Sequence, residues 1–453
     1  MKVAIAYPPH PVPFSSRSEP LGAGYLAAVL APHHDLLLVD GHGHNLPPAA
    51  IADNVIGFEP DLVAVSMPHN PQVPAGRELI RLLREKAPGL RIVAGGNLPT
   101  FRPQEFLGPG GADFVVRHEG EGPLRLLVEA LERGRRGDLE QVPGLAWVEG
   151  AESGAVRFGP PPRRNRDLDA LPFPARHLWP CYPSPYAELC LVASRGCPFA
   201  CPNCSTSEMW MHQRFSRSPE NVLAEVAELS SRYPGWVLNF VDDFFTAQRG
   251  WVVELSRSLE ELGGGRLRWL CNTRPDFLDP DLIQVMGRSG CRGVFLGVES
   301  GSLRVLEALG KRITPDGVME VLRACLDNGI RPNVSFMLGL PFEAEEDVAA
   351  TLRLMERIAV ELPRCEMNLR HVTPVVGTRL YEERERFGID ILDDDQFHLN
   401  LMRARIRTRH LDPDFLNQAY FTARILMARR QAAVAGGRGV ERVADPGPGQ
   451  AGS

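Results

Sequence analysis

The chain has 453 residues, of which 44% are hydrophobic and 23% are charged, and its formal net charge is −6. This length predicts two or three domains, and the composition is that of an ordinary globular protein. Because no basic cluster stands on an aromatic face, we expect no nucleic-acid partner. No apolar run reaches the roughly 18 residues that cross a bilayer, and no cleavable signal opens the chain, so we expect a cytoplasmic protein without a membrane partner.

Residues 1–140 are expected to form one doubly wound domain. Short apolar runs alternate with helical patterns, for example Leu79, Leu82 and Leu83 on one helix face. Such alternation favours a parallel sheet covered on both faces, as in flavodoxin-like and Rossmann-like folds. The expected strands are residues 3–7, 36–39, 62–66, 92–94 and 114–116.

The loops after these strands concentrate glycine and polar residues. Ligands of open parallel sheets sit outside the carboxyl ends of the strands. Paired glycines, here Gly95 and Gly96, let a backbone approach a bulky flat ligand closely. The alternative is that these are only the turn residues of a flavodoxin-like scaffold.

Residues 141–182 are expected to link this domain to the next. Apolar runs at 145–148 and 155–158 flank a polar, glycine-containing turn and predict a hairpin. Three prolines at 160–162 and the run Leu-Pro-Phe-Pro-Ala-Arg at 171–176 predict an extended, stiff connector. This connector is either a strap beside the functional sites or a plain linker.

The strongest motif is Cys197, Cys201 and Cys204, in C-x3-C-x2-C spacing directly after the apolar run 189–193. Three thiolates on one tight loop can hold three irons of a cubic iron–sulfur cluster and leave the fourth iron open. A zinc site needs a fourth ligand, and the near candidates Cys190 and His212 complete no familiar spacing. A disulfide is disfavoured because the remaining cysteines are scattered singly. We therefore expect a [4Fe–4S] cluster.

With this loop the chain resembles the radical S-adenosylmethionine (SAM) enzymes, in the branch that carries an N-terminal cobalamin-binding domain. The resemblance covers about residues 1–380, and the runs Gly-Gly-x-x-Pro-Thr at 95–100 and Glu-Gly-Glu at 119–121 add to it. The D-x-H-x-x-G motif of methionine-synthase-type domains is absent, so His10 and His69 are candidates for the lower cobalt ligand by position only. The resemblance implies cobalamin contacts at Ser66, His69, Gly95, Gly96, Glu119 and Gly120.

Residues 183–381 are expected to form the partial (βα)6 TIM-like barrel of this family. Function should then lie on the loops that leave the carboxyl ends of the strands. The expected strands are residues 189–193, 237–241, 267–271, 294–298, 334–338 and 367–372, and helical patterns occur at 221–231, 251–262, 318–328 and 345–360.

The resemblance also implies where SAM binds. Asp242 and Asp243 follow the second strand, where a carboxylate can pair with the SAM ammonium group. Any single carboxylate of this kind is otherwise a helix N-cap or a surface group. The other implied SAM contacts are Arg274 after the third strand, Glu299 and Ser300 for the ribose, Gly339 for a close approach to adenine, and Phe199 near the adenine ring.

The remaining chain is expected to cap the barrel with residues 382–432, which include a helical pattern at 415–430, and to end in a disordered tail at 433–453. The whole resemblance implies a cobalamin-dependent radical SAM methyltransferase. It would cleave SAM to a 5′-deoxyadenosyl radical, and methylcobalamin would methylate an unactivated carbon of a small-molecule or peptide substrate. An electron donor such as flavodoxin or ferredoxin is implied as a partner. Ring formation or rearrangement with the same cofactors, and a non-catalytic electron-transfer protein, remain alternatives.

Overall fold

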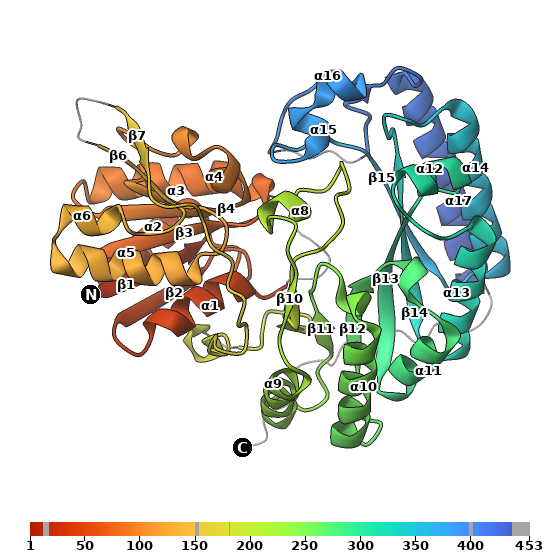
Figure 1. Ribbon diagram of the computed structural model, residues 1–453, viewed down its shortest axis with the longest axis horizontal. Coiled ribbons are helices and arrows are strands. Elements are labelled where there is room, and N and C mark those ends of the chain that lie inside the picture. The colour runs from red at the N-terminus through yellow and green to blue at the C-terminus, as the bar shows by residue number, and fades with distance from the viewer. Residues whose placement is uncertain (12–17, 150–153, 181, 398–401, 437–453) are drawn as a thin grey trace.

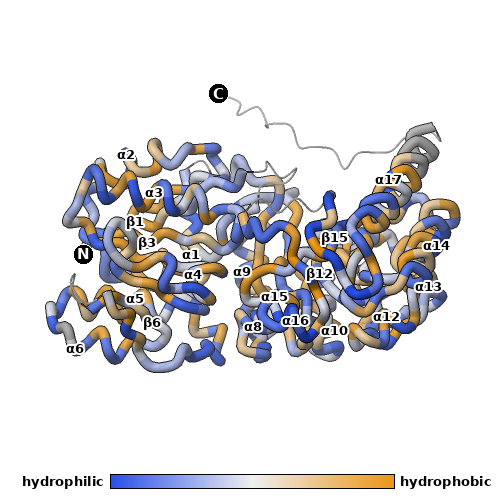
Figure 2. Tube along the Cα trace, turned by 90° about the horizontal axis from the view of Figure 1, so that it is seen from above, coloured by the Kyte–Doolittle hydropathy of each residue, from blue (hydrophilic) through white to orange (hydrophobic). Residues whose placement is uncertain are grey.

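The computed structural model describes residues 1–11, 18–149, 154–180, 182–397 and 402–436. Two units, each built on a parallel sheet, lie side by side, and the chain passes once from the first to the second (Figure 1). Hydrophobic and hydrophilic residues alternate along covering helices such as α3 (Val73–Lys86), so that each buries one face (Figure 2). None of the helices within the described ranges is both long and apolar enough to cross a bilayer.

The first unit contains a seven-stranded sheet in the order β2-β1-β3-β4-β5-β6-β7. The first five strands are parallel and almost wholly apolar, as expected for strands that are covered on both faces. The last two are antiparallel and form a hairpin at one edge. The strands are β1 (Lys2–Tyr7), β2 (Asp35–Asp40), β3 (Leu62–Met67), β4 (Arg91–Gly96), β5 (Phe114–Val116), β6 (Leu145–Val148) and β7 (Val156–Phe158).

Helices cover both faces of this sheet, which is the doubly wound arrangement. One hydrophobic cluster joins the sheet to α2 and α3, and another joins its opposite face to α1 and α5. The bounds of these and the two shorter helices are α1 (Leu21–Leu30), α2 (Pro48–Phe58), α4 (Asn97–Phe101), α5 (Glu121–Arg133) and α6 (Arg136–Leu139).

The connector between the units departs from the expected linker. Its hairpin, β6 and β7, extends the first sheet instead of standing apart from it. Beyond the hairpin, the short helix η3 (Arg176–Leu178) carries the buried Arg176, which donates to Glu19 of the first unit at 3.0 Å and to Glu225 of the second at 2.7 Å. The connector is therefore a strap that is tied to both units.

The second unit is a six-stranded parallel sheet in the order β15-β14-β13-β12-β11-β8, the sequential order of a partial barrel. All six expected strands are present, with ends that differ by a few residues. They are β8 (Leu189–Leu191), β11 (Leu238–Phe240), β12 (Trp269–Thr273), β13 (Cys291–Glu299), β14 (Arg331–Leu338) and β15 (Glu366–His371). The covering helices are α9 (Pro219–Arg232), α10 (Arg249–Gly263), α11 (Pro280–Arg288), α12 (Leu303–Ala308), α13 (Pro315–Asp327) and α14 (Glu345–Glu361).

The C-terminal region contains two short helices, α15 (Arg379–Glu382) and α16 (Arg384–Phe387), the small β16–β17 pair (Asp390–Ile391 and Ile406–Arg407) and the long helix α17 (Pro413–Gly436). Helix α17 packs along α14 and β15 at the side of the barrel (Figure 1). It continues to Gly436, past the expected start of a disordered tail, and residues 437–453 lie outside the described residues.

Candidate functional site

The three motif cysteines line one cavity of about 410 Å³ at the carboxyl ends of the second sheet. Their loop lies between β9 (Ser194–Arg195) and α8 (Thr206–Met209), and all three thiols are partly exposed. Among the described residues, no three His, Cys, Asp or Glu side chains gather closely enough to hold a single metal ion. A cubic cluster does not require such a group, since each of its thiolates binds a different iron. Three thiols that line one cavity are the donor set that such a cluster needs.

The start of this loop is fixed by two adjacent carboxylates at the end of β11. Asp242 is buried and accepts the Ala193 amide at 3.0 Å, and burial raises its pKa to about 6. Asp243 accepts the Gly196 amide at 3.2 Å. Gly196 has φ +92°, and a Cβ there would lie 2.0 Å from the Gln213 carbonyl oxygen. Glycine is therefore required immediately before the first cysteine.

Arg274 and Phe199 form one wall of the cysteine cavity. The guanidinium carbon lies 3.8 Å from the centre of the Phe199 ring, a cation–π contact. Arg274 also donates to Asp276 at 2.9 and 2.6 Å and to the Gly310 carbonyl at 2.8 Å. Its Nη1 atom is buried without a protein partner, so this wall offers a bound molecule one donor.

Glu299, the last residue of β13, also lines the cysteine cavity. It has φ +76°, although it is not glycine, and Ser335 donates to its carboxylate at 3.3 Å. Gly297 makes room for this carboxylate, since a Cβ there would lie 2.6 Å from Glu299 Oε1. Burial raises the pKa of Glu299, and the nearby Lys311 opposes that rise.

Lys311 is a cavity residue that sequence reasoning missed. It is buried, it lines the cavity, and its ammonium group donates to the Gly297 carbonyl at 2.7 Å. Burial lowers its pKa, which the Glu299 carboxylate counteracts. It lies on a loop after α12 rather than at a strand end. Lys311 stands between Gly310 and Arg312 in a stretch that also contains Arg304 and Glu307, so nothing in the sequence set it apart from a surface lysine.

Two of the expected SAM contacts lie outside the cysteine cavity. The Ser300 hydroxyl is fully buried and lies 3.0 Å from the hydroxyl of Thr351 on α14. The Gly339 amide donates to Glu343 at 2.8 Å, inside a tight turn after β14. Phe199, Asp242, Asp243, Arg274 and Glu299 do line the cavity.

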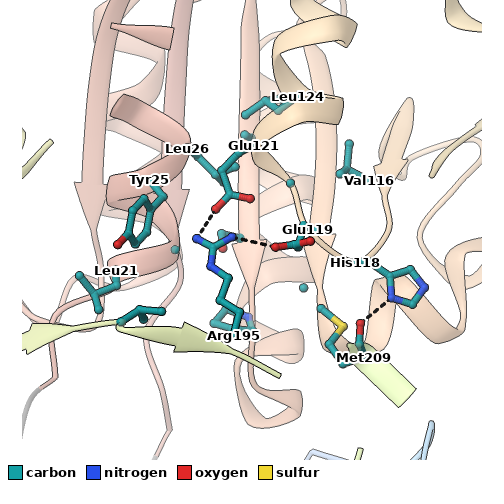
Figure 3. Close-up of a pocket in the computed structure, with 18 of the residues that line it drawn as sticks. Leu21, Tyr25, Leu26, Val116, His118, Glu119, Glu121, Leu124, Arg195 and Met209 are labelled. Atoms are coloured by element: carbon teal, nitrogen blue, oxygen red, sulfur yellow. Dashed lines mark hydrogen bonds and ion pairs between the residues drawn. The ribbon is translucent and has the colours of Figure 1, made fainter. Parts of the chain in front are cut away.

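A second cavity, of about 310 Å³, opens at the carboxyl ends of the first sheet (Figure 3). Its walls are mostly apolar and come from α1, α5 and the ends of β3, β4 and β5, together with residues of the second unit near β9, α8 and the end of β11. A Cβ at Gly95 would meet only the Val116 carbonyl, at 3.5 Å, so this backbone faces open space. At Gly96 a Cβ would lie 2.0 Å from the Met67 carbonyl. Of the residues expected to contact cobalamin, Ser66, Gly95, Gly96, Glu119 and Gly120 line this cavity.

The histidines proposed for the lower face of cobalt do not line this second cavity. The ring of His69 lies 6.5 Å from that of His10, and His10 lies 6.1 Å from His42. Burial lowers the pKa of His69 to about 4, so its imidazole is neutral at neutral pH.

The two cavities share a wall. Val241 and Asp243 line both of them, at the end of β11. A molecule in the first unit's cavity and one in the cysteine cavity would therefore be separated by very little protein.

Two family models match the two units. The B12 binding domain matches residues 13–128, and the Radical SAM superfamily matches residues 191–355. An uncharacterized methyltransferase of Pyrococcus horikoshii is 30% identical over 390 residues, which are 84% of this chain and 83% of that protein. The chain is a cobalamin-binding radical SAM enzyme.

This radical SAM enzyme is also similar in sequence to a cyclase and in fold to a solved methyltransferase structure. The anaerobic magnesium-protoporphyrin IX monomethyl ester cyclase of Rubrivivax gelatinosus is 28% identical over 73% of this chain and 60% of that protein. The solved structure of the methyltransferase TsrM from Kitasatospora setae, with cobalamin and a [4Fe-4S] cluster bound, has a TM-score of 0.70 at 21% identity. It covers 87% of this chain and 81% of that chain, and it shows that the fold is shared.

The cofactors of this radical SAM enzyme are a [4Fe–4S] cluster, SAM and cobalamin, and the two cavities fit them. The cysteines supply three thiolates, and the orphaned Arg274 Nη1, Lys311 and Glu299 provide charged groups for a zwitterionic nucleoside such as SAM. The second cavity is apolar and floored by the Gly95 backbone, which suits a bulky ring system or its nucleotide tail.

Proposed function

We propose that this protein is a cobalamin-dependent radical SAM methyltransferase that methylates an unactivated carbon of a small-molecule or peptide substrate. The observation that carries the proposal is the wall of Val241 and Asp243 shared by the two cavities. A methyl carrier and a radical source that act on one carbon must lie next to each other. The methyltransferase relative of Pyrococcus horikoshii, aligned along most of both chains, supports methyl transfer.

When bound, the cluster and SAM supply a carbon radical and cobalamin supplies the methyl group. The chain's own residues bind and orient these groups. Asp243 presents a carboxylate at the boundary of the two cavities, and Arg274, Lys311 and Glu299 present charged groups to the cysteine cavity. Phe199 packs against Phe244 and Phe277, with ring centres at 5.5 and 5.7 Å, and this apolar wall helps to exclude water.

A second candidate function keeps both cofactors and ends in ring formation. It is favoured by the similarity to the cyclase of Rubrivivax gelatinosus, although this chain spans only 60% of that protein. A bare electron carrier is the least supported alternative, because such a protein needs no charged cavity beside its cluster.

The deciding experiment uses anaerobically reconstituted protein with hydroxocobalamin, a titanium(III) reductant and SAM labelled in its methyl group. We expect about four irons per chain, release of 5′-deoxyadenosine, and transfer of the label to cobalamin with release of S-adenosylhomocysteine. Deoxyadenosine without S-adenosylhomocysteine would favour the cyclase, and neither product would favour the electron carrier. Cys201→Ala is the control, and deoxyadenosine formation by that variant would contradict the cluster assignment.

The reductant in the cell is proposed to be a small electron-transfer protein such as flavodoxin or ferredoxin. A reducing, cytoplasmic setting agrees with three partly exposed thiols that must stay reduced to bind iron. Replacement of titanium by purified flavodoxin and its reductase tests this partner, with deoxyadenosine as the readout.

A further inference from the structure

A buried ion-pair network joins the wall of the cobalamin cavity to the cysteine loop (Figure 3). Arg195, two residues before Cys197, donates to Glu119 at 3.0 Å and to Glu121 at 2.6 Å. Glu119 belongs to the loop that follows β5 in the first unit, Glu121 is the first residue of α5, and both line the cavity. Arg195 itself lies 4.9 Å from the centre of the Tyr25 ring of α1, and its side chain is only 8% exposed.

Glu119 accepts three hydrogen bonds from protein groups. One of its oxygens accepts Arg195, and the other accepts Arg164 at 2.7 Å and the Asn165 amide at 2.8 Å. It therefore has little capacity left for a bond to cobalamin, the role implied by family resemblance. Its position between Arg195 and Arg164 indicates that it holds these two side chains in place instead.

Arg164 extends the network to the far side of the cysteine loop. It donates to the carbonyls of Trp210 at 2.7 Å and Gln213 at 3.1 Å. Between these carbonyls, Met211 and His212 both have positive φ, an arrangement that costs free energy and needs support. The Gln213 carbonyl is the group that closes against Gly196. The loop after β5 thus supports the cysteine loop from both sides.

We propose that Arg195 is a positioning residue that makes retention of the iron–sulfur cluster depend on whether the cobalamin cavity is filled. This inference rests on the two cofactors, not on the reaction, and goes beyond the proposed function. With no ligand in the cavity, water reaches only the small part of Arg195, Glu119 and Glu121 that lines it, and it weakens their ion pairs from that side. Bound cobalamin excludes that water, and the same ion pairs strengthen in the drier surroundings. The cysteine loop is then held more firmly.

The test measures iron release to a ferrous chelator from anaerobic, cluster-loaded protein, with and without hydroxocobalamin. In the wild type, cobalamin should slow release about fivefold, the size expected from strengthening one charge-assisted hydrogen bond. In Arg195→Gln, release should be fast and cobalamin should change it less than twofold. Arg357→Met, which removes the exposed Arg357–Asp316 pair between α14 and α13, is the control, because neither residue lines either cavity, and it should keep the full effect.

A second variant is needed because Arg195→Gln deprives both Glu119 and Glu121 of their cation, and the protein could then misfold or fail to bind cobalamin. This second variant is Glu121→Gln. It keeps Arg195 on Glu119 and should also lose most of the cobalamin effect. The double variant should release iron no faster than Arg195→Gln alone, since both changes break one interaction. Two results would overturn the proposal. One is a wild type whose iron release cobalamin does not slow. The other is a full cobalamin effect that persists in Glu121→Gln and in any Arg195→Gln protein that folds.

Discussion

The neighbouring carboxylates Asp242 and Asp243, just after β11, have different roles. Asp242 is buried and accepts hydrogen bonds from the Ala193 amide and the Ser194 hydroxyl, so it shapes the entry to the cysteine loop. Asp243 lines both cavities and also accepts the Gly196 amide. The first carboxylate thus serves the fold, and the second is available to a ligand.

This difference predicts opposite phenotypes for two matched substitutions. Asp243→Asn should weaken SAM binding about tenfold, because it removes a charge-assisted contact, and leave the iron content unchanged. Asp242→Asn should lower iron content and thermal stability, because the Ala193 amide and Ser194 hydroxyl lose a charged acceptor. Equilibrium dialysis with SAM and an iron assay measure both. Equal SAM affinity in Asp243→Asn and wild type would remove Asp243 from the SAM site.

The adjacent glycines of β4 also differ. Gly95→Val should fold normally and lower cobalamin occupancy, because its side chain would enter the cavity and meet little protein. Gly96→Val should destabilise the protein by about 3 kcal/mol, because a Cβ at φ +120° would press on the Met67 carbonyl. Absorbance of bound hydroxocobalamin and a melting curve separate the two effects. Full cobalamin occupancy in Gly95→Val would place the ligand elsewhere.

At the scale of elements, the strands were predictable and their partners were not. Apolar runs marked β1 to β5 and all six barrel strands, since a strand buried on both faces needs such a run. The β6–β7 hairpin was assigned to the linker because its pairing with β5 is antiparallel and leaves no trace in local periodicity. Arg195 and Glu119 are 76 positions apart in the sequence, so no local pattern could predict their contact.

The turn after β14 predicts a pH dependence. Burial raises the pKa of Glu343 to about 7, although the Leu340 and Gly339 amides donate to its carboxylate. Between pH 4.5 and 7 the unfolded chain ionises this group while the folded protein keeps the proton. Stability from this residue is therefore present at low pH and lost as pH rises through 7.

Glu343→Gln should remove that loss, because the amide oxygen can still accept both backbone donors. We expect the variant to exceed the wild type in stability by roughly 1–3 kcal/mol at pH 8 and to approach it near pH 5. Urea unfolding of the cluster-loaded protein at the two pH values measures the difference. A variant that is less stable than the wild type at pH 8 would show that the ionised carboxylate is favourable.

At the scale of the whole molecule, the strap holds the two units in one arrangement. Arg176 binds Glu19 of the first unit and Glu225 of α9, and its third contact is the Cys190 carbonyl at 2.7 Å. The side chains of Arg176, Glu19 and Glu225 are nearly inaccessible to water. Because the two cofactor cavities share a wall, this strap also controls their alignment.

Arg176→Met should therefore destabilise the protein by about 3–5 kcal/mol, since it leaves two carboxylates buried without their cation. The comparison variant is Tyr186→Phe, which removes a single hydrogen bond to Asp40 across the same junction and should cost about 1 kcal/mol. Thermal unfolding and limited proteolysis of the connector report both. A mild effect of Arg176→Met, equal to that of Tyr186→Phe, would mean that the strap is a plain linker.

The charges in this junction have a consequence for the response to salt. Four of its buried carboxylates are paired with four buried guanidinium groups, and dissolved ions screen such sheltered pairs weakly. The geometry between the cofactors should then be the same in dilute buffer and in concentrated salt, and ionic strength should act only on the encounter with an electron donor. The groups concerned are Glu19, Glu119, Glu121 and Glu225 with Arg164, Arg176, Arg195 and Arg217.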